Sequence, residues 1–508
     1  MEITQNSFVI GLDSSTQSTK AIAWRGDGVA MAEGRAPIAM ANPQVGWFEQ
    51  DPEDWWQSCL LALGDLGTKI DLAGAQGLAI SNQRETICFL GEDYRASQPA
   101  IVWLDERARR QMKTVSKALG AGNIHRISGK PVDITPVLYR LAWLKQNDPD
   151  TFAATACFAD VQAYLVHRLT GQMKTGWISS DPMGCFDVVE KRWSGEILDY
   201  LGLEPQRFPE SHRPGTQLGS VTEDGSAATG LATGLPVFAA GGDGQCAGLG
   251  TNCTMPGRAY INLGTAVVSG VWSRDYIYNS SWRTEISATG TGYINEMCLR
   301  SGAFLINWFV DNFTEGQKNN PGIFAELEAE AALIPIGSEG LLTLPYWAGC
   351  MNPHWDSEAR GVFIGLTGSH TPAHIYRSIL EGITLDVAQG TQAMVEAGID
   401  IDEFIAIGGG AQSALWCQML ADATARPVRV CDTVEASALG AGMIAAFGAG
   451  HFATIEDAAA AMSGSHATVH PNARAHARYA DLLEIYKPVY HNNAASFAEL
   501  VAFAGQER

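Results

Sequence analysis

Residues 234–248 read GLPVFAAGGDGQCAG and lie close to the middle of the 508-residue chain. The apolar run from Pro236 to Ala240 predicts a buried strand, followed by a glycine-lined loop and the start of a helix rich in small residues. Glycines on both sides of Asp243 leave room for another backbone or a ligand to approach closely. Ligands of open α/β sheets bind outside the carboxyl ends of the strands, which is where this stretch places Asp243.

Asp243 has two interpretations from this stretch alone. The carboxylate caps the following helix by accepting a hydrogen bond from a backbone N–H. Alternatively, it is a general base that takes a proton from a hydroxyl while a phosphoryl group arrives. The residue type and its position fit both interpretations.

The composition is that of an ordinary globular protein, with 46% hydrophobic and 18% charged residues. A chain of 508 residues is too long for one hydrophobic core, so we expect two or more domains. The formal net charge of −21 argues against nucleic acids and membranes as partners, because binding to phosphate-rich surfaces needs clustered Lys and Arg.

The cysteine pattern and the N-terminus together favour a cytoplasmic protein. The 10 cysteines include no CxxC pair, and several lie inside apolar runs, as is typical of reduced core thiols. Residues 1–7 have neither the basic nor the apolar segment of a signal peptide. No window approaches the roughly 20 apolar residues that a membrane span requires.

A strand–turn–strand pattern followed by α/β alternation occurs twice. The first round begins at residue 8 and includes a helix with Asp51 as its N-cap and Pro52 at its first position. The second round begins at residue 258. We therefore expect an α/β protein of two domains, residues 1–250 and residues 251–508, each a sheet covered by helices. Asp243 then lies at the seam between them, where ligand clefts are common.

Two polar turns occupy corresponding places in the two rounds. Asp13 follows the first strand and opens a turn rich in Ser and Thr that ends at Lys20. Hydroxyls and turn amides bind phosphate oxygens, and a carboxylate there holds Mg²⁺, usually through water. An Asx-type turn explains Asp13 equally well in isolation. Gly264 and Thr265 form the second turn, and two such turns would clamp the phosphates of ATP between the domains.

Polar residues at two further strand ends suggest a pocket for hydroxyl groups. The segment from Asn82 to Thr86 interrupts two apolar strands, and its Arg84 and Glu85 offer a donor and an acceptor to a polyol. A solvated hairpin turn with a surface ion pair is the alternative. Trp103 and Asp105 also end an apolar run, although a core tryptophan and a helix N-cap would explain them as well.

Two other motifs are weak. Gly440 begins a superficial match to GxGxxA, but it lies inside a helical pattern, so close helix packing is the better explanation. His370 and His374 have Pro372 between them and no accompanying HExxH glutamate, which argues against a zinc site.

Three segments of the chain resemble the FGGY carbohydrate kinases. They are GVFIGL at residues 361–366 with SILE at residues 378–381, GGGA at residues 408–411, and EASALGA at residues 435–441. The resemblance covers about residues 8–450, and it implies two actin-like (ribonuclease H-like) ATPase domains with a catalytic cleft between them. It also implies ATP and Mg²⁺ as cofactors, a small sugar or polyol as substrate, and a homodimer.

The resemblance assigns roles to individual residues. Asp243 would be the general base, and Asp13 and Asp243 would hold Mg²⁺ through water. The substrate-binding residues would be Gln83, Arg84, Glu85, Trp103, Asp105, Asp243 and Gln245. The ATP-binding residues would be Ser15, Thr16, Ser18, Thr19, Lys20, Gly264, Thr265, Gly302, Asn307, Gly409, Gly410 and Ser413.

The substrate motifs point in two directions. Residues 82–86, NQRET, are similar to the polyol-binding segment of glycerol kinases, whereas the Trp-x-Asp-x-Arg pattern at residues 103–107 looks like that of pentulose kinases. Arg140 departs from the N-terminal family signature, which has Lys there. We expect a ketopentose, D-xylulose first, with glycerol or another ketose or polyol as the alternative. An ATPase like actin or Hsp70, without a sugar substrate, is the alternative from another class.

Overall fold

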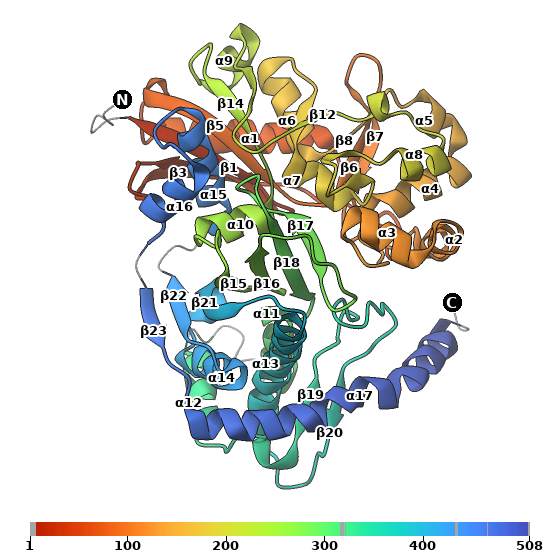
Figure 1. Ribbon diagram of the computed structural model, residues 1–508, viewed down its shortest axis with the longest axis vertical. Helices are drawn as coiled ribbons and strands as arrows, with labels where there is room; N and C mark the ends of the chain where they lie inside the picture. The colour runs from red at the N-terminus through yellow and green to blue at the C-terminus, as the bar shows by residue number, and fades with distance from the viewer. Residues whose placement is uncertain (1–6, 315–319, 321, 432–434, 465, 506–508) are drawn as a thin grey trace.

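Two large mixed sheets, one above the other in Figure 1, form the framework of the chain in this computed structural model, which describes residues 7–314, 320, 322–431, 435–464 and 466–505. The predicted lack of a signal peptide concerns residues that lie almost entirely outside these ranges. Each sheet is built around a central strand whose apolar residues are buried on both faces, as strands covered by helices on both sides require.

The first sheet places three strand ends side by side. Its central strand β1 pairs in parallel with β5, which pairs in parallel with β14, whereas β2 and β3 form an antiparallel meander on the other side. The order is β13-β14-β5-β1-β2-β3. Its strands are β1 (Phe8–Ser14), β2 (Ser18–Trp24), β3 (Ala30–Pro37), β5 (Ala75–Asn82), β13 (Gln217–Ser220) and β14 (Pro236–Gly242).

The second sheet repeats this plan, as the sequence pattern predicts. β15 pairs antiparallel with β16 and parallel with β21, and β21 pairs parallel with β22. The order is β17-β18-β16-β15-β21-β22-β23. Its strands are β15 (Gly257–Leu263), β16 (Val267–Ser273), β17 (Arg283–Ile286), β18 (Tyr293–Leu299), β21 (Ile401–Ile407), β22 (Val428–Cys431) and β23 (His466–Val469). The sequence analysis did not predict β17 and β18.

Helices from both ends of the chain cover the first sheet. α1 (Pro52–Gly67) and α6 (Val161–Thr170) bury one face, and Asp51 caps α1 by accepting a hydrogen bond from the Glu53 N–H at 2.9 Å, as predicted. The opposite face packs against α15 (Ala436–Gly448) and α16 (Ile455–Met462). Figure 1 shows these two helices, in blue, beside the red strands β1 and β3. Residues near the C-terminus therefore complete the core of the N-terminal sheet.

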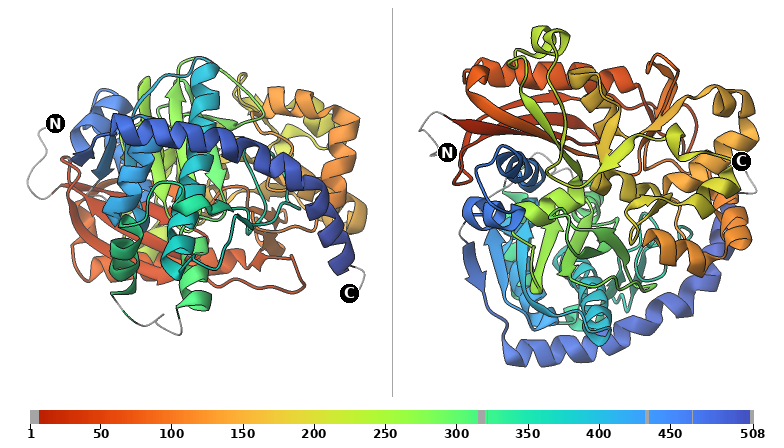
Figure 2. Two further views of the ribbon diagram at one scale, coloured as in Figure 1. Left: turned by 90° about the horizontal axis from the view of Figure 1, so that it is seen from below. Right: turned by 45° about the horizontal axis from the view of Figure 1, so that its top comes forward.

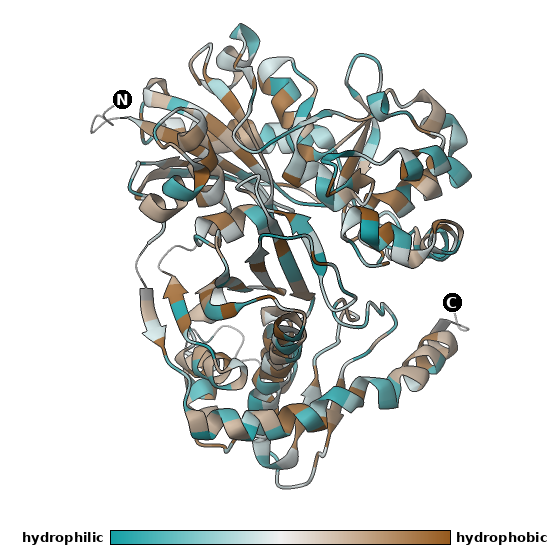
Figure 3. Cartoon of the chain, viewed as in Figure 1, coloured by the Kyte–Doolittle hydropathy of each residue, from teal (hydrophilic) through white to brown (hydrophobic). Residues whose placement is uncertain are grey.

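Five helices surround the second sheet. They are α11 (Ala303–Phe313), α12 (Ile323–Ala332), α13 (Pro372–Glu396), α14 (Ala414–Thr424) and α17 (Ala473–Gly505). α17 runs along the outside of this half of the molecule, and hydrophobic and hydrophilic residues alternate along it (Figures 2 and 3). Its Tyr486 donates to the buried Asp386 of α13 at 3.3 Å, and Tyr346 donates to the same oxygen at 2.9 Å.

A mainly helical lobe extends from the side of the first sheet. Its helices include α2 (Arg109–Leu119), α3 (Ala121–Ser128), α4 (Val137–Asn147), α5 (Pro149–Ala154), α7 (Trp177–Ser180) and α8 (Gly195–Leu201). A small sheet of order β4-β7-β6-β8 joins this lobe to the first sheet, with β4 (Glu49–Gln50), β6 (Ile87–Leu90), β7 (Ala96–Ile101) and β8 (Cys157–Ala159).

The predicted loop before Asp243 does not form. β14 ends at Gly242, and α10 (Asp243–Gly250) begins at the next residue. Gly241 makes this junction possible because its φ of 147° is a conformation that L side chains rarely adopt, and a Cβ there would meet the backbone of Ser179 at 2.6 Å. The N-cap is Gly242, so Asp243 is the first helical residue rather than the cap.

The structure bears on three other predictions from the sequence. Gly440 is a close-packing position, because a Cβ there would overlap the Cys246 carbonyl on α10. All ten cysteines are buried. None of the helices in the described ranges is both long and apolar enough to cross a membrane. The domain boundary at residue 250 stays a prediction.

Candidate active site

The carboxyl ends of β1, β5 and β14 bring the polar residues of the N-terminal half together. Asp13 stands opposite Ser81 in the ladder between β1 and β5, and Gly241 stands opposite Ser81 on the other side. Asp243 follows one residue beyond β14, and Arg84 follows two residues beyond β5. The parallel pairing therefore places three segments that are distant in sequence at one edge of the sheet.

Asp13 is buried beside a second carboxylate. Its Oδ1 accepts a hydrogen bond from the Ser81 hydroxyl at 2.8 Å. Burial, and then the negative charge of Asp243, raise the pKa of Asp13 to about 6. Because the charges of these two carboxylates act on each other, a cation near both would be stabilised.

Asp243 is held in place without being enclosed. Its Oδ1 lies 3.1 Å from Nε of Arg84 and accepts a hydrogen bond from the Gly244 N–H at 2.8 Å. The Asp243 side chain is nevertheless 38% exposed. The low-dielectric surroundings raise the pKa of this carboxyl, and the Arg84 guanidinium opposes the rise.

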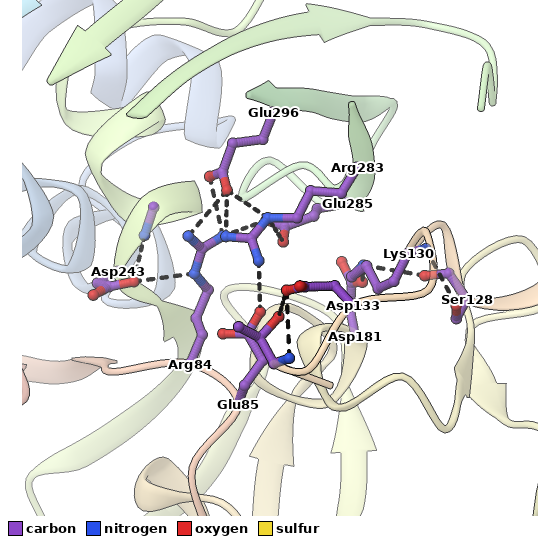
Figure 4. Close-up of polar contacts among 12 residues, drawn as sticks. Arg84, Glu85, Ser128, Lys130, Asp133, Asp181, Asp243, Arg283, Glu285 and Glu296 are labelled. Carbon is purple, nitrogen blue, oxygen red and sulfur yellow. Dashed lines mark hydrogen bonds and ion pairs between the residues drawn. The ribbon is translucent and has the colours of Figure 1, made fainter. Parts of the chain in front are cut away.

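Two strands of the C-terminal half carry charged residues into the same place (Figure 4). Arg84 Nη1 lies 2.6 Å from Glu285 on β17 and 3.0 Å from Glu296 on β18. Arg283, also on β17, donates to Glu85 at 2.7 Å. Burial raises the pKa of Glu285 to about 7. Although burial alone would raise it, Arg283 and Arg84 hold the pKa of Glu296 at about 2.

The first turn of the chain is organised by internal contacts. Ser15 donates to the Ser18 carbonyl at 2.9 Å, and Thr16 accepts a hydrogen bond from the Trp103 indole at 2.9 Å. Thr19 is fully buried, and its hydroxyl has no hydrogen-bond partner among the described residues. Lys20 pairs with Glu435, at the start of the EASALGA segment. The structure therefore joins this turn to α15 and to the segment that contains Trp103.

The residues predicted to bind substrate differ in how far they are buried and in whether their polar groups already bond to other residues. Gln83 is buried and hydrogen-bonds to Gln50 at 2.8 Å. Asp105 is fully buried, and its two oxygens accept hydrogen bonds from the Phe48 N–H and from Arg107. Gln245 is also buried and lies 3.5 Å from Arg84. By contrast, Trp103 and Asp243 are only half-buried. Asp105 is not the cap of α2, because the N-cap is Ala108.

The residues predicted to bind ATP in the C-terminal half line a cavity of about 710 Å³. Because β15 and β21 are parallel neighbours, Gly264 and Thr265 lie next to the turn that follows β21. Apart from Gly302, the predicted residues of this half all line the cavity: Gly264, Thr265, Asn307, Gly409, Gly410 and Ser413. Gly302 instead packs behind the turn, and its N–H donates to the Thr265 carbonyl at 2.9 Å.

Aromatic side chains also line this cavity. They are Phe324, Tyr376 and Trp416, and Glu328 and Gln412 accompany them. The cavity thus combines glycine backbone groups with flat apolar surfaces, which suits a nucleotide with phosphates at the glycine turn and its base against aromatic rings.

Comparison with protein families identifies this arrangement. The N-terminal domain model of the FGGY family of carbohydrate kinases matches residues 8–250, and the C-terminal domain model matches residues 259–449. The chain belongs to the FGGY family of carbohydrate kinases. The family resemblance, the ATP-dependent phosphotransferase class and the actin-like two-sheet fold are therefore confirmed.

Relatives of the kinase cover nearly its whole length. A xylulose kinase of Bacillus subtilis (strain 168) is 29% identical over 95% of this chain and 96% of its own. A glycerol kinase of Bordetella parapertussis is 30% identical over 90% of this chain and 91% of its own. The crystal structure of xylulose kinase from Rhodospirillum rubrum matches with a TM-score of 0.90 and 26% identity, covering 97% of this chain and 100% of that one.

The kinase has a donor set that fits Mg²⁺. Asp13 and Asp243 supply hard oxygen donors, lie close enough for the charge of Asp243 to act on Asp13, and both have a raised pKa. Among the described residues there is no cluster of three or more His, Cys, Asp and Glu side chains suited to a metal. Mg²⁺ ordinarily binds through one or two carboxylates with water and substrate phosphates completing its shell, so two carboxylates suffice.

Sequence reasoning missed the C-terminal contribution to this site. Arg283, Glu285 and Glu296 lie on strands that the sequence analysis did not predict. A usable signal was present, because one charged residue, Glu296, stands inside the mainly apolar run of residues 293–299, YINEMCL, where a buried strand should have none without a partner.

Proposed function

We propose that this kinase transfers the γ-phosphate of ATP to a hydroxyl of D-xylulose. The observation that carries the reaction is the proximity of Asp243 and Asp13 at the ends of neighbouring strands, in a chain whose C-terminal half holds a cavity suited to a nucleotide. The observation that favours the sugar is the similarity of the chain, over most of its length, to several xylulose kinases.

Asp243 is the proposed general base. A sugar hydroxyl is a poor nucleophile, and a carboxylate within hydrogen-bond reach accepts its proton as the new P–O bond forms. The ion pair with Arg84 and the Gly244 N–H fix one oxygen of Asp243. Its raised pKa keeps the carboxylate basic enough to receive a proton.

Alignment of the two substrates supplies most of the remaining rate acceleration. Phosphoryl transfer depends on alignment and charge neutralisation more than on covalent chemistry by the protein. In our proposal, Ser15, Thr16, Ser18, Thr19 and Lys20 on one side and Gly264 and Thr265 on the other face the phosphates. Mg²⁺ at Asp13 and Asp243 would neutralise phosphate charge when bound. Lys20 has to exchange Glu435 for a phosphate oxygen to take part.

The sugar would lie against Trp103, Glu85 and Asp243, with Arg84 beside it. Gln83, Asp105 and Gln245 are occupied by protein contacts, so we propose that they shape the pocket wall. Glycerol is the alternative substrate, because residues 82–86 resemble the glycerol kinase segment and glycerol kinases are also relatives.

A substrate panel tests this function. Coupled measurement of ADP release with ATP, Mg²⁺ and a set of pentuloses, tetruloses and polyols, glycerol included, should give the highest kcat/KM for D-xylulose. A higher value for glycerol would replace the substrate and keep the reaction. No stimulation of ADP release by any compound would overturn the kinase assignment and favour an actin- or Hsp70-like ATPase.

We also propose a cellular location and an oligomeric state. The burial of the cysteines, together with the lack of any CxxC pair in the sequence, supports a reducing cytoplasmic location. The family resemblance supports a homodimer, which equilibrium sedimentation would test.

A further inference from the structure

Glu85 is a strained residue held by an ion pair from the other half of the chain. Its φ of 49° is unusual for a residue with a side chain, and the side chain is almost wholly buried. Arg283 Nη1 lies 2.7 Å from Glu85 Oε1. Among the residues that the structure describes, none donates a hydrogen bond to the second oxygen, Oε2. The carboxylate is thus fixed at one oxygen and available at the other.

Arg283 is itself fixed in two directions. Its Nε donates to Glu296 Oε1 at 2.7 Å, while Nη1 reaches Glu85, so one planar guanidinium joins the two halves of the chain. Glu296 also accepts from the Tyr260 hydroxyl at 2.9 Å and from Arg84 Nη2 at 3.1 Å. A continuous series of contacts therefore runs from Glu85 through Arg283, Glu296 and Arg84 to Asp243 (Figure 4).

β17, the strand that carries Arg283, is anchored to the N-terminal half of the chain through Thr284 and Ile286. The Thr284 N–H donates to the Gly129 carbonyl at 2.8 Å, and Lys130 donates to the Thr284 carbonyl at 3.1 Å. The Ile286 N–H donates to Asp181 at 2.5 Å. β17 therefore cannot shift relative to Glu85 without breaking backbone contacts.

We propose that Arg283 is a positioning residue for the sugar, which acts by orienting Glu85 so that its free oxygen accepts a hydrogen bond from a substrate hydroxyl. This inference rests on the proposed function and deepens it, because a residue of the C-terminal half completes a sugar pocket whose other walls are N-terminal. The arginine is suited to this role, since its planar fork holds two carboxylates in fixed directions, whereas a lysine presents a single point charge with freely rotating donors.

The test uses the full-length enzyme with Arg283→Met and Arg283→Lys. In Arg283→Met we expect kcat/KM for the sugar to fall about 10- to 100-fold, the loss that follows when a site group moves by about 1 Å. The KM for ATP should stay within about twofold of the unmodified enzyme. Arg283→Lys should recover part of the loss, and Arg258→Met, which removes a C-terminal arginine paired with Glu403 at 2.9 Å, should change neither parameter.

A pH profile separates positioning from a merely structural role. Burial raises the pKa of Glu85, and Arg283 opposes that rise. Without the arginine the pKa rises further, so the acidic limb of kcat/KM for the sugar should move to higher pH in Arg283→Met and return in Arg283→Lys. A double-mutant cycle with Glu85→Gln should show that the two losses are not additive.

The outcomes are distinct. Additive losses, or an unchanged sugar kcat/KM and pH profile in folded Arg283→Lys and Arg283→Met, would overturn the inference while the kinase assignment stands. If Arg283→Met does not fold, the Arg283→Lys variant decides alone. A kcat/KM for the sugar equal to that of the unmodified enzyme would then contradict the inference. Lack of turnover by the unmodified enzyme with every sugar would overturn the proposed function and this inference with it.

Discussion

Arg84 and Asp243 form an ion pair at adjacent strand ends, with Nε of Arg84 3.1 Å from Oδ1 of Asp243. The same guanidinium is buried against Glu285 and Glu296 of the C-terminal half, whereas the Asp243 side chain remains 38% exposed. Arg84 is therefore held in place by several ion pairs, whereas Asp243 stays accessible from outside. This asymmetry suits a carboxylate that must keep its direction and still meet a substrate.

Asp243→Asn should lower kcat by at least ~100-fold, within the usual contribution of a general base. The amide keeps the shape of the side chain and an acceptor for the Gly244 N–H, but it cannot take up a proton. ATP binding measured by calorimetry should persist. Asp400→Asn, at an exposed position, serves as the matched control, and near-normal turnover by Asp243→Asn would remove it from the role of base.

Arg84→Met should destabilise the folded protein by about 3–5 kcal/mol, because breaking a buried pair leaves uncompensated charge. Glu285 and Glu296, both fully buried, lose one of the two arginines that pair with both of them, and only Arg283 remains. Urea denaturation would measure the loss. Arg84→Lys should show a smaller one, since it keeps the charge without the fork. Equal stability of Arg84→Met and the unmodified protein would contradict the ion-pair network.

Gly408→Ala should weaken ATP binding and destabilise the fold by about 1–3 kcal/mol, the cost of a strained backbone conformation. Gly408 has a φ of 84°, and a Cβ there would overlap Asn262 Oδ1 and lie 3.1 Å from the Leu263 carbonyl carbon. The distortion would reach the turn at Gly264 directly. Calorimetric ATP binding and thermal unfolding measure the two effects.

Gly64→Ala is the matched control for Gly408→Ala. A Cβ at Gly64, inside α1, meets nothing within 4 Å. Alanine should therefore be tolerated there and should raise stability by up to about 1 kcal/mol through its helix propensity. Parallel losses in both variants would mean that the Gly408 conformation is not special.

Asp386→Asn should flatten the dependence of stability on pH. Burial raises the pKa of Asp386 to about 7, against the hydrogen bonds from Tyr346 and Tyr486. Between about pH 4 and pH 7 the folded protein retains this proton and the unfolded chain releases it, so the contribution of Asp386 to the free energy of unfolding falls as the pH rises and levels off above pH 7. Urea denaturation at several pH values should show that the variant has lost this negative contribution to the slope. Asp13 and Asp160, whose pKa values are raised to about 6, contribute a slope of the same sign, and His125 and His354, whose pKa values are lowered to about 4, contribute one of the opposite sign. An identical slope in both proteins would contradict this assignment.

Local signals predicted most of the first sheet and its turns. The apolar runs around Ile10 and Ile22 and the Asp51-Pro52 helix start depend on neighbouring residues, so they can be read from a short window. The direct passage from β14 into α10 could not be read this way, because it depends on how closely Gly241 approaches residues 178 and 179. Tertiary packing decided it.

The residues of the candidate site were likewise predicted where a local pattern marked them and missed where distant partners decided their role. Asp13, Asp243 and the Gly264 turn follow strands and were predicted from that pattern. Their meeting needed only the parallel order of the strands. Arg283, Glu285 and Glu296 were missed because their meaning lies in partners about 200 residues away, such as Arg84 and Glu85. A charged residue in a strand is readable as an anomaly, but its partner is not.

The position of α15 has a consequence for how the protein is made. Much of one face of the first sheet is covered by residues 436–462, which leave the ribosome after every strand of the second sheet except β23. Until then, strands completed early in translation carry an uncovered apolar surface, which is the kind of surface that chaperones hold and that aggregates. A fragment ending near residue 250 would keep that surface permanently. The two halves are thus separate in sequence but interdependent in folding, and the N-terminal sheet becomes a finished unit only near the end of synthesis.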